Sequence, residues 1–81
     1  MSSSSRPRKT IRQLREERDW SQVELAARLG VARYTVQQWE VGARLPSARN
    51  WWRLADLFGI SVQELVTGHV EQVRQEMAAD D

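Results

Sequence analysis

Residues 31–40, VARYTVQQWE, carry an unusual set of hydrogen-bonding side chains around one apolar spine. An ordinary solvent-facing helix would more often carry lysine and glutamate where this segment has Arg33, Tyr34, Gln37 and Gln38. A glutamine amide can form paired hydrogen bonds with adenine, and an arginine guanidinium can form them with guanine. A neutral amide also avoids the repulsion that a carboxylate meets at a phosphate. These residue types suit contact with nucleic-acid bases, although glutamine and arginine are also good formers of a plain solvated helix.

The helical period fixes which of these side chains point away from the core. With Val36 turned inward, a rotation of about 100° per residue directs Tyr34 and Gln38 most squarely outward. A tyrosine at this position could stack on a base, contact a thymine methyl group or donate to a phosphate. The flanking positions are Arg33 and Gln37 on one side and Thr35 on the other.

Capping signals divide the chain into short helices that would position this segment. The second helix begins with a capping box at Ser21, with glutamate three residues later, and ends at Gly30. The last helix repeats the box from Ser61, and we expect it to end at Gly68. Five helices are expected in all, and no alternating run predicts a strand. The fold class is therefore an all-α, five-helix bundle.

The link between the second and third expected helices is three residues long. Gly30 can take the left-handed conformation that ends a helix, and Val31 can fill the angle between the two helices. This is the connection of a helix-turn-helix, in which the second helix of the pair, here residues 33–41, lies in the major groove of DNA. The turn and the cap spacing favour a base-reading face over a plain solvated one.

Two charged residues lie among core positions of their helices. Arg15 shares a face with the apolar residues of the first helix, and Glu40 shares one with Val36 and Trp39 of the third. An unpaired buried ion is costly. We therefore expect Arg15 and Glu40 to form an ion pair that ties the first helix to the end of the third. The alternative is that each side chain extends separately to water.

Length and composition restrict the classes of protein to which this chain can belong. The 81 residues make one small domain, and the absence of cysteine fits a reducing, cytoplasmic setting without disulfides or thiolate-bound metal. No apolar run approaches the ~20 residues of a membrane span, and the N-terminus lacks the apolar segment of a secretory signal. Residues 1–8 are serine-rich and basic, so we expect a disordered arm there.

The net charge of +1 is unevenly distributed along the chain. Residues 1–68 carry 11 Arg and Lys against 7 Asp and Glu, whereas residues 69–81 carry one Arg against four acids. Eleven of the twelve basic residues are arginine, whose forked guanidinium suits phosphate groups and base edges. A basic body of this kind is typical of proteins with a polyanionic partner.

Residues 11–66 resemble the Xre family of helix-turn-helix regulators, which have the fold of the Cro and C1-type phage repressors. The resemblance rests on two segments, IRQLREERDWSQVELAARLGVARYTVQQWEVG and LPSARNWWRLADLFGISVQELV. The combination of SQVELA, LGV, WEVG and GIS is far more specific than any one of these pieces. The resemblance implies a lambda-repressor-like domain that binds double-stranded DNA, usually as a two-fold dimer on a palindromic operator.

The resemblance also implies roles for single residues. Positions matching Arg33, Tyr34 and Gln38 read bases in this family, and Gln22 matches a residue that anchors the second helix to the DNA backbone and supports the first reading position. The expected base-reading residues are Arg33, Tyr34, Gln37 and Gln38. The expected DNA-backbone contacts are Gln22, Thr35, Arg44 and Arg49. The chain departs from the family at Ala32, where members often carry a Ser or Thr helix cap, and losing that cap costs about 1 kcal/mol.

Residues 69–81 extend beyond the helix-turn-helix domain, which we place at residues 9–68. If the chain stays helical past Gly68, its apolar residues form a stripe that could be a dimer seam, joined by a tryptophan that lies off the core stripe of its own helix. The candidate dimer contacts are Trp52, Val66, Val70, Val73 and Met77. A frayed tail is the alternative, because glycine favours a helix end. We favour a homodimer, since one short recognition helix rarely gives enough specificity alone.

The sequence gives no sign of a metal site, an enzyme active site or a cofactor site. His69 is the one histidine and has no cysteine or carboxylate cluster around it, so we expect a loop or helix-end residue and no metal site. No nucleophile–base pair, phosphate-binding glycine loop or small-molecule site is recognisable, so we expect neither an enzyme nor a cofactor. The leading interpretation is a sequence-specific regulator of transcription that acts as a repressor. The alternative is a protein-interaction module or an antitoxin, with Trp52 and the C-terminal stripe as its partner surface.

Overall fold

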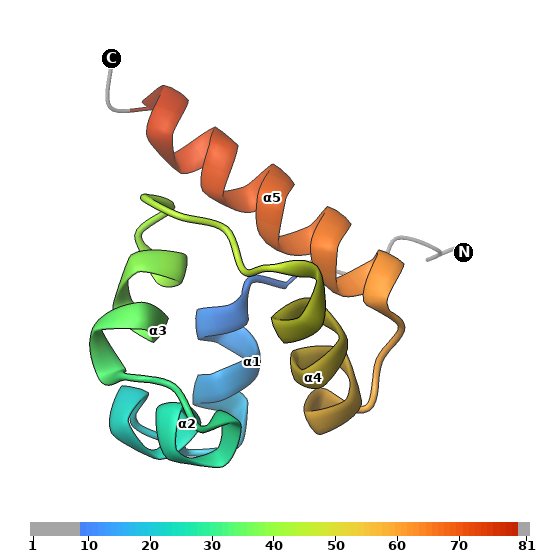
Figure 1. The fold of residues 1–81 in the computed structure, drawn as a ribbon. Coiled ribbons are helices and arrows are strands. Elements are labelled where there is room, and N and C mark those ends of the chain that lie inside the picture. The colour runs from blue at the N-terminus through green and yellow to red at the C-terminus, as the bar shows by residue number, and fades with distance from the viewer. Residues whose placement is uncertain (1–8, 80–81) are drawn as a thin grey trace.

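The computed structural model describes residues 9–79, with side chains described as far as residue 76. This part of the chain forms five helices (Figure 1): α1 (Ile11–Glu17), α2 (Gln22–Leu29), α3 (Arg33–Glu40), α4 (Ala48–Phe58) and α5 (Val62–Ala79). The prediction of an all-α, five-helix bundle is confirmed. The arm expected at residues 1–8 and the acidic end at residues 80–81 lie outside the described residues.

Hydrogen-bonding side chains fix where most of the helices begin. The hydroxyl of Ser21 accepts from the N–H of Glu24 at 3.0 Å, and the Glu24 carboxylate accepts from the N–H of Ser21 at 2.7 Å. This is the capping box that the sequence predicts at the start of α2. Side-chain hydroxyls also cap the other helices except α3; they belong to Thr10, Ser47 and Ser61. Ala32 precedes α3 and makes no such bond.

The core lies where α1 is enclosed by α2 and α3 on one side and α4 on the other (Figure 1). Apolar side chains from all five helices fill it, among them Ile11, Leu25, Val36, Leu54 and Leu65. Trp39 and Trp51 are 3% and 9% exposed and belong to this core. Trp20, after the end of α1, stacks on Phe58 of α4 with the ring centroids 6.2 Å apart.

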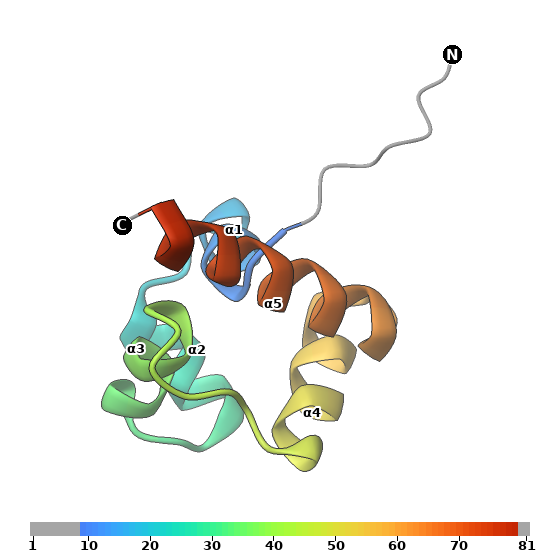
Figure 2. The ribbon, with the colours of Figure 1, turned by 90° about the horizontal axis from the view of Figure 1, so that it is seen from above.

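Helix α5 lies across one end of the other four helices (Figures 1 and 2). It passes through Gly68 without a break, so the prediction that a fifth helix ends there is wrong, and so is the frayed tail as far as Ala79. A glycine inside a helix costs about 1 kcal/mol. The burial of Leu65, His69 and Val73 along one face of α5 outweighs that cost. Within residues 9–79 no helix combines the length and the apolar character needed to cross a membrane.

The valines expected to form a dimer seam pack instead on their own domain. Val73 is only 6% exposed, and Val66 and Val70 are partly buried against the core. The expectation that these valines form a dimer seam is therefore not met, because α5 turns the stripe toward α4 and the rest of the core. The side chain of Met77 lies outside the described residues. Trp52, on α4, is 67% exposed.

His69 is neither a loop residue nor a helix-end residue, so that expectation is also wrong. It lies within α5 and is fully buried. Its Nδ1 accepts a hydrogen bond from the N–H of Ile11 at 3.0 Å. Its Nε2 lies 3.0 Å from the carbonyl oxygen of Trp39 and donates to it, because a carbonyl can only accept. The neutral ring therefore ties α5 to the first residue of α1 and to the last turn of α3.

Candidate nucleic-acid interface

A three-residue turn joins α2 to α3. Gly30 has φ +72° and ψ +32°, the left-handed conformation that closes a helix at low cost only for glycine. The N–H of Val31 then donates to the carbonyl of Ala26 at 3.0 Å, and the Val31 side chain packs against the core. Helix α3 begins two residues later, at Arg33. The turn that the sequence predicts is present.

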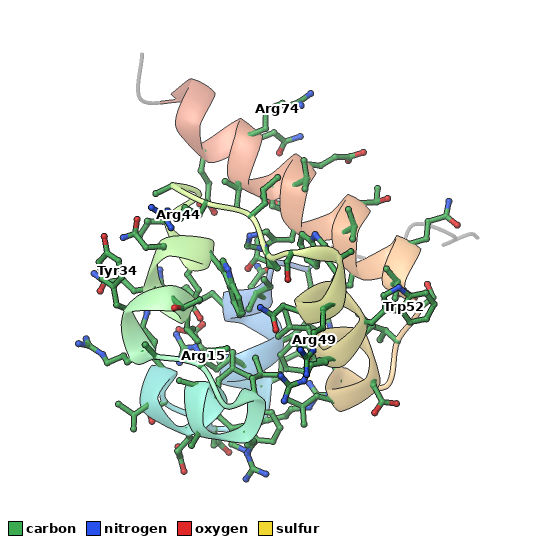
Figure 3. The ribbon with its side chains drawn as sticks, viewed as in Figure 1. Arg15, Tyr34, Arg44, Arg49, Trp52 and Arg74 are labelled. Atoms are coloured by element: carbon green, nitrogen blue, oxygen red, sulfur yellow. The ribbon has the colours of Figure 1, made fainter. Side chains whose placement is uncertain are left out.

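Helix α3 divides into a buried face and an outer polar face. Val36 is fully buried and holds the helix against the core together with Trp39. Arg33 and Tyr34 are exposed, the tyrosine by 63%, and Figure 3 shows Tyr34 extending from the outer side of the helix. The remaining polar residues of the helix surface are half-buried and comprise Thr35, Gln37 and Gln38. Arg33, Tyr34, Thr35, Gln37 and Gln38 are called the outer polar face below, and Tyr34 is its most exposed large hydrophobic side chain.

The loop after α3 is fastened to the end of the helix. The backbone N–H groups of Ala43 and Arg44 donate to the carbonyl of Gln38 at 3.0 and 3.3 Å. The exposed Arg44 side chain therefore begins close to the outer polar face, and Figure 3 places Arg44 on the same side of the molecule as Tyr34. The structure brings this expected backbone contact next to the expected base-reading residues.

A buried ion pair sets the position of α3 relative to α1. Arg15 Nε donates to Glu40 Oε2 at 2.7 Å, and Arg15 Nη2 donates to Glu40 Oε1 at 3.1 Å. The two side chains are 11% and 4% exposed, so the expected pair is present and neither residue extends separately to water. Arg15 Nη1 also donates to the carbonyl of Trp20 at 2.7 Å. The hydrogen bond to Glu40 raises the pKa of Arg15 above its ordinary value despite burial.

Gln22 adds α2 to this cluster. Its Nε2 donates to Glu40 Oε1 at 3.0 Å, so the amide supports the end of α3 rather than the first reading position at Arg33. Three helices thus meet at one carboxylate, which accepts from two side chains. Within the described residues, no buried side-chain nitrogen or oxygen lacks a hydrogen-bond partner. These bonds hold the end of α3 to both α1 and α2.

Two expected site residues lie away from the outer polar face. Arg49 is an exposed residue of α4, and Trp52 lies on the side of the molecule opposite Tyr34 (Figure 3).

Arg18 has a structural role that was not predicted from the sequence. Its Nη2 donates to the carbonyl of Phe58 at 2.7 Å and so joins α1 to α4. The position of Arg18 on the core face of α1 was the feature of the sequence that could have indicated this role. Among the described residues, no group of three His, Cys, Asp or Glu side chains could hold a metal ion.

The uncapped start of α3 allows a test of how much a side-chain N-cap would add to the stability of the domain. Ala32 has φ −75° and ψ 150°, the extended conformation of an N-cap residue, so a hydroxyl there could accept from the N–H groups of the first turn. We expect Ala32→Thr to stabilise the domain by about 1 kcal/mol, which raises the melting temperature by about 4–8 °C. Ala32→Val is the matched control, because valine has the shape of threonine without the hydroxyl. Equal melting temperatures for the two variants would contradict the account.

A short turn between two packed helices, the second with an exposed polar face, defines a helix-turn-helix domain. The helix-turn-helix family model matches residues 11–65, which is more than half of the chain. The chain belongs to this family, as a member of the Xre group with the Cro and C1-type fold.

Among characterised proteins, the chain is similar to the cryptic phage CTXphi transcriptional repressor RstR of Vibrio cholerae. The two are 39% identical over 57 residues, which cover 70% of this chain and 51% of RstR. The chain therefore spans about half the length of this relative. No solved structure shows a significant match.

Proposed function

We propose that this chain is a sequence-specific, double-stranded-DNA-binding regulator of transcription that acts as a repressor in the cytoplasm. The observation that carries the proposal is the outer polar face of α3, which follows a helix-turn-helix turn and is held from behind by the Arg15–Glu40 pair. Membership of the family supports DNA binding, and the likeness to RstR supports repression. We assign no catalytic activity, cofactor or small-molecule ligand to the domain.

The roles of single residues follow from their places on α3. The N-terminal residues of a recognition helix come closest to base edges. Arg33 and Tyr34 occupy those positions, and Gln37 and Gln38 lie one turn further along the same helix. Arginine suits guanine, and glutamine suits adenine. We therefore propose that these four side chains contact the base edges.

Phosphate contacts would hold the reading face in register. Arg44 is well placed, because its backbone is fastened to the end of α3. Thr35 lies on the flank of the outer polar face, and Gln22 at the start of α2 keeps one amide N–H beyond the bond that it donates to Glu40. Arg49 is the one member of this set that lies on α4. Such contacts position a protein on the duplex without reading its sequence.

The proposed target is a palindromic operator bound by a homodimer, since two-fold symmetry in the protein matches two-fold symmetry in the site. An alternative function as a protein-interaction module or antitoxin is favoured by one observation, the 67% exposure of Trp52. Titration with mixed-sequence duplex DNA at two salt concentrations separates the two. A DNA-binding protein weakens as salt rises, with a log–log slope of about −0.9 per phosphate neutralised. Failure to bind even at low salt would leave only the interaction module.

Two alanine substitutions distinguish base reading from backbone contact. Gln38→Ala should lower operator affinity by about 1–3 kcal/mol and leave non-specific binding nearly unchanged. The loop should stay in place, because its bonds go to the backbone carbonyl of Gln38, which alanine keeps. Arg44→Ala should instead weaken binding to every sequence and reduce the salt slope by about 1. The assignments are checked by titration of operator and unrelated duplexes; an equal loss on both for Gln38→Ala would overturn the reading role.

A further inference from the structure

A histidine occupies the inner face of α5, where packing alone would favour an apolar residue. His69 lies between Leu65 and Val73 at helical spacing and is as fully buried as Leu65. A leucine there would fill a similar space and leave no polar group to satisfy. His69 also lies beyond residue 65, where the match to the helix-turn-helix family model ends. A role for this residue therefore does not follow from membership of the family.

The two ring nitrogens of His69 join three helices. Nδ1 accepts from the N–H of Ile11, the first residue of α1, at 3.0 Å. Nε2 lies 3.0 Å from the carbonyl oxygen of Trp39, in the last turn of α3, and donates to it. The edge of the ring also meets Trp51 of α4, with the ring centroids 5.9 Å apart. Both bonds form together only in the neutral tautomer that carries its proton on Nε2.

The carbonyl of Trp39 lies where α3 passes into the loop that carries Arg44. The same carbonyl accepts from the N–H of Gly42 at 3.2 Å. The neighbouring carbonyl, that of Gln38, accepts from the N–H groups of Ala43 and Arg44. The bond from α5 therefore fixes the end of α3 and the start of the loop together.

Sequence-specific contacts need this end of α3 to be placed accurately. Side chains that recognise a partner must be held within about 0.5 Å of the productive geometry. Non-specific binding depends on the summed attraction between basic side chains and phosphates, which tolerates small displacements. A loosened α3 should therefore lose more affinity for an operator than for unrelated DNA.

We infer that His69 is a positioning residue for sequence-specific DNA binding: the neutral ring holds the end of α3 and the loop after it in the geometry that reads an operator, and protonation releases them. A proton on Nδ1 faces the N–H of Ile11, so the ring must turn away, and its Nε2 then leaves the carbonyl of Trp39. The inference rests on the proposed function and adds to it a dependence of operator affinity on pH.

The charges around the ring set the direction of this dependence. Burial is the largest effect and lowers the pKa of His69, whereas the charges of Glu40 on α3 and Glu76 on α5 raise it. From α1, Arg15 is paired with Glu40 and so offsets that charge. From α4, the residue against the ring is Trp51. The ring is therefore neutral at neutral pH, and operator affinity should fall as the solution is acidified.

An NMR titration of His69, alone and with a duplex that carries the operator, tests the inference. The chain has one histidine, so its ring gives one isolated signal. Operator affinity should fall about fivefold or more as that signal reports protonation, whereas affinity for an unrelated duplex should change little. By reciprocity, the operator should lower the pKa of His69 by the logarithm of the same factor. An unchanged pKa in the complex, parallel losses on both duplexes, or unfolding before the ring is protonated overturns the inference.

Variants separate the hydrogen bonds from general stability. His69→Gln keeps a donor and an acceptor but does not titrate, so its operator affinity should stay within about threefold of the unchanged chain and should be independent of pH in this range. His69→Leu, measured below its unfolding temperature, should lose operator affinity already at neutral pH. Leu65→Ala is the matched control, because it weakens the packing of the same helix and leaves the bonds of His69 in place. Equal losses of operator affinity for His69→Leu and Leu65→Ala would contradict the positioning role.

A measurement without DNA keeps this inference apart from the proposed function. The backbone amide signals of Ala43 and Arg44 should move together with the His69 titration, because their loop is held through the end of α3. Amide signals that do not respond to protonation of His69 overturn the inference, whatever the DNA experiments give. If no duplex is bound at any pH, the proposed function fails, while these signals still decide whether His69 holds the loop.

Discussion

Glu40→Ala is expected to lower the free energy of unfolding by about 3–5 kcal/mol, the range observed when one partner of a buried ion pair is removed. Arg15 would remain buried, with its Nε and Nη2 groups deprived of both acceptors. Gln22 would lose its acceptor at the same carboxylate. For a domain of this size the melting temperature should fall by roughly 12 °C or more. Thermal and urea denaturation measure the loss.

A double-mutant cycle tests whether the loss belongs to the pair. Arg15→Ala should also destabilise the domain strongly, and Glu40→Ala should then add little further loss in that background. Arg12→Ala is the control, because Arg12 makes an exposed pair with Glu16 at 3.2 Å and should cost less than about 1 kcal/mol. Strictly additive losses at Arg15 and Glu40 would show that the two charges are not coupled.

His69→Leu should produce the other large loss of stability. Leucine fills much of the space of the imidazole but offers no polar atom to the N–H of Ile11 or to the carbonyl of Trp39. Each buried group left without a partner costs about 1–3 kcal/mol. The denaturation midpoint in urea at neutral pH measures the effect. A midpoint equal to that of the unchanged chain would show that these two bonds contribute nothing to stability.

The same residue should make stability depend on pH. Burial lowers the pKa of His69 below its ordinary value of 6.5, and the smaller opposing effects come from the bond to Trp39 and from the charges of Glu40 and Glu76. A proton on Nδ1 would also face the N–H of Ile11, which is a donor. Between pH 6.5 and the native pKa the unfolded chain therefore binds more protons than the native one, so stability falls as the pH falls through this interval.

Urea titrations at a series of pH values from 7.5 down to 5 isolate this contribution. In the unchanged chain, the contribution of His69 to the free energy of unfolding should be constant above pH 6.5 and should decrease below that value. In His69→Leu this part of the dependence of stability on pH should be absent. The variant serves as the control for carboxylates that titrate at lower pH. Identical pH slopes for the two chains would contradict the role given to His69.

Much of the fold was predictable because its signals are local. The capping box at Ser21 and the glycine at position 30 act on backbone groups within one turn of the chain, and both are present as expected. The Arg15–Glu40 pair could be predicted despite its range of 25 residues, since each charge lies on the core face of its own helix and needs a partner. A helical period of 3.6 also fixes the outward direction of Tyr34 relative to Val36.

The errors arose where packing between distant segments decides the outcome. Gly68 favours a helix end by local preference, but burial of Leu65 and Val73 carries α5 through it. Periodicity placed the α5 valines on one stripe if the helix continued, without showing whether their own core or a second chain would cover them. His69 lies four residues from both Leu65 and Val73, so its spacing indicated burial more reliably than the search for metal-ligand neighbours did.

In the candidate site, too, local features could be predicted from the sequence and contacts between distant segments could not. The outer polar face of α3 follows from helical spacing, and Tyr34 is exposed as that spacing predicts, whereas Gln38, which was expected to point as squarely outward, is half-buried. The bond from Gln22 to Glu40 joins α2 to the far end of α3, and it depends on how those helices cross. The fastening of Arg44 to the carbonyl of Gln38 depends likewise on the path of the loop after α3. Neither contact has a signature in residue type or spacing.

Selection of bound duplexes from a random pool, run side by side with the unchanged chain and with Gln38→Ala, tests the central claim most directly. The claim is that the outer polar face of α3 reads base sequence. It predicts that the unchanged chain recovers a palindrome with half-sites about one helical turn apart. Gln38→Ala should recover the same palindrome with one position relaxed in each half-site. Recovery of no preferred sequence by the unchanged chain, or of an identical sequence preference by both, would contradict it.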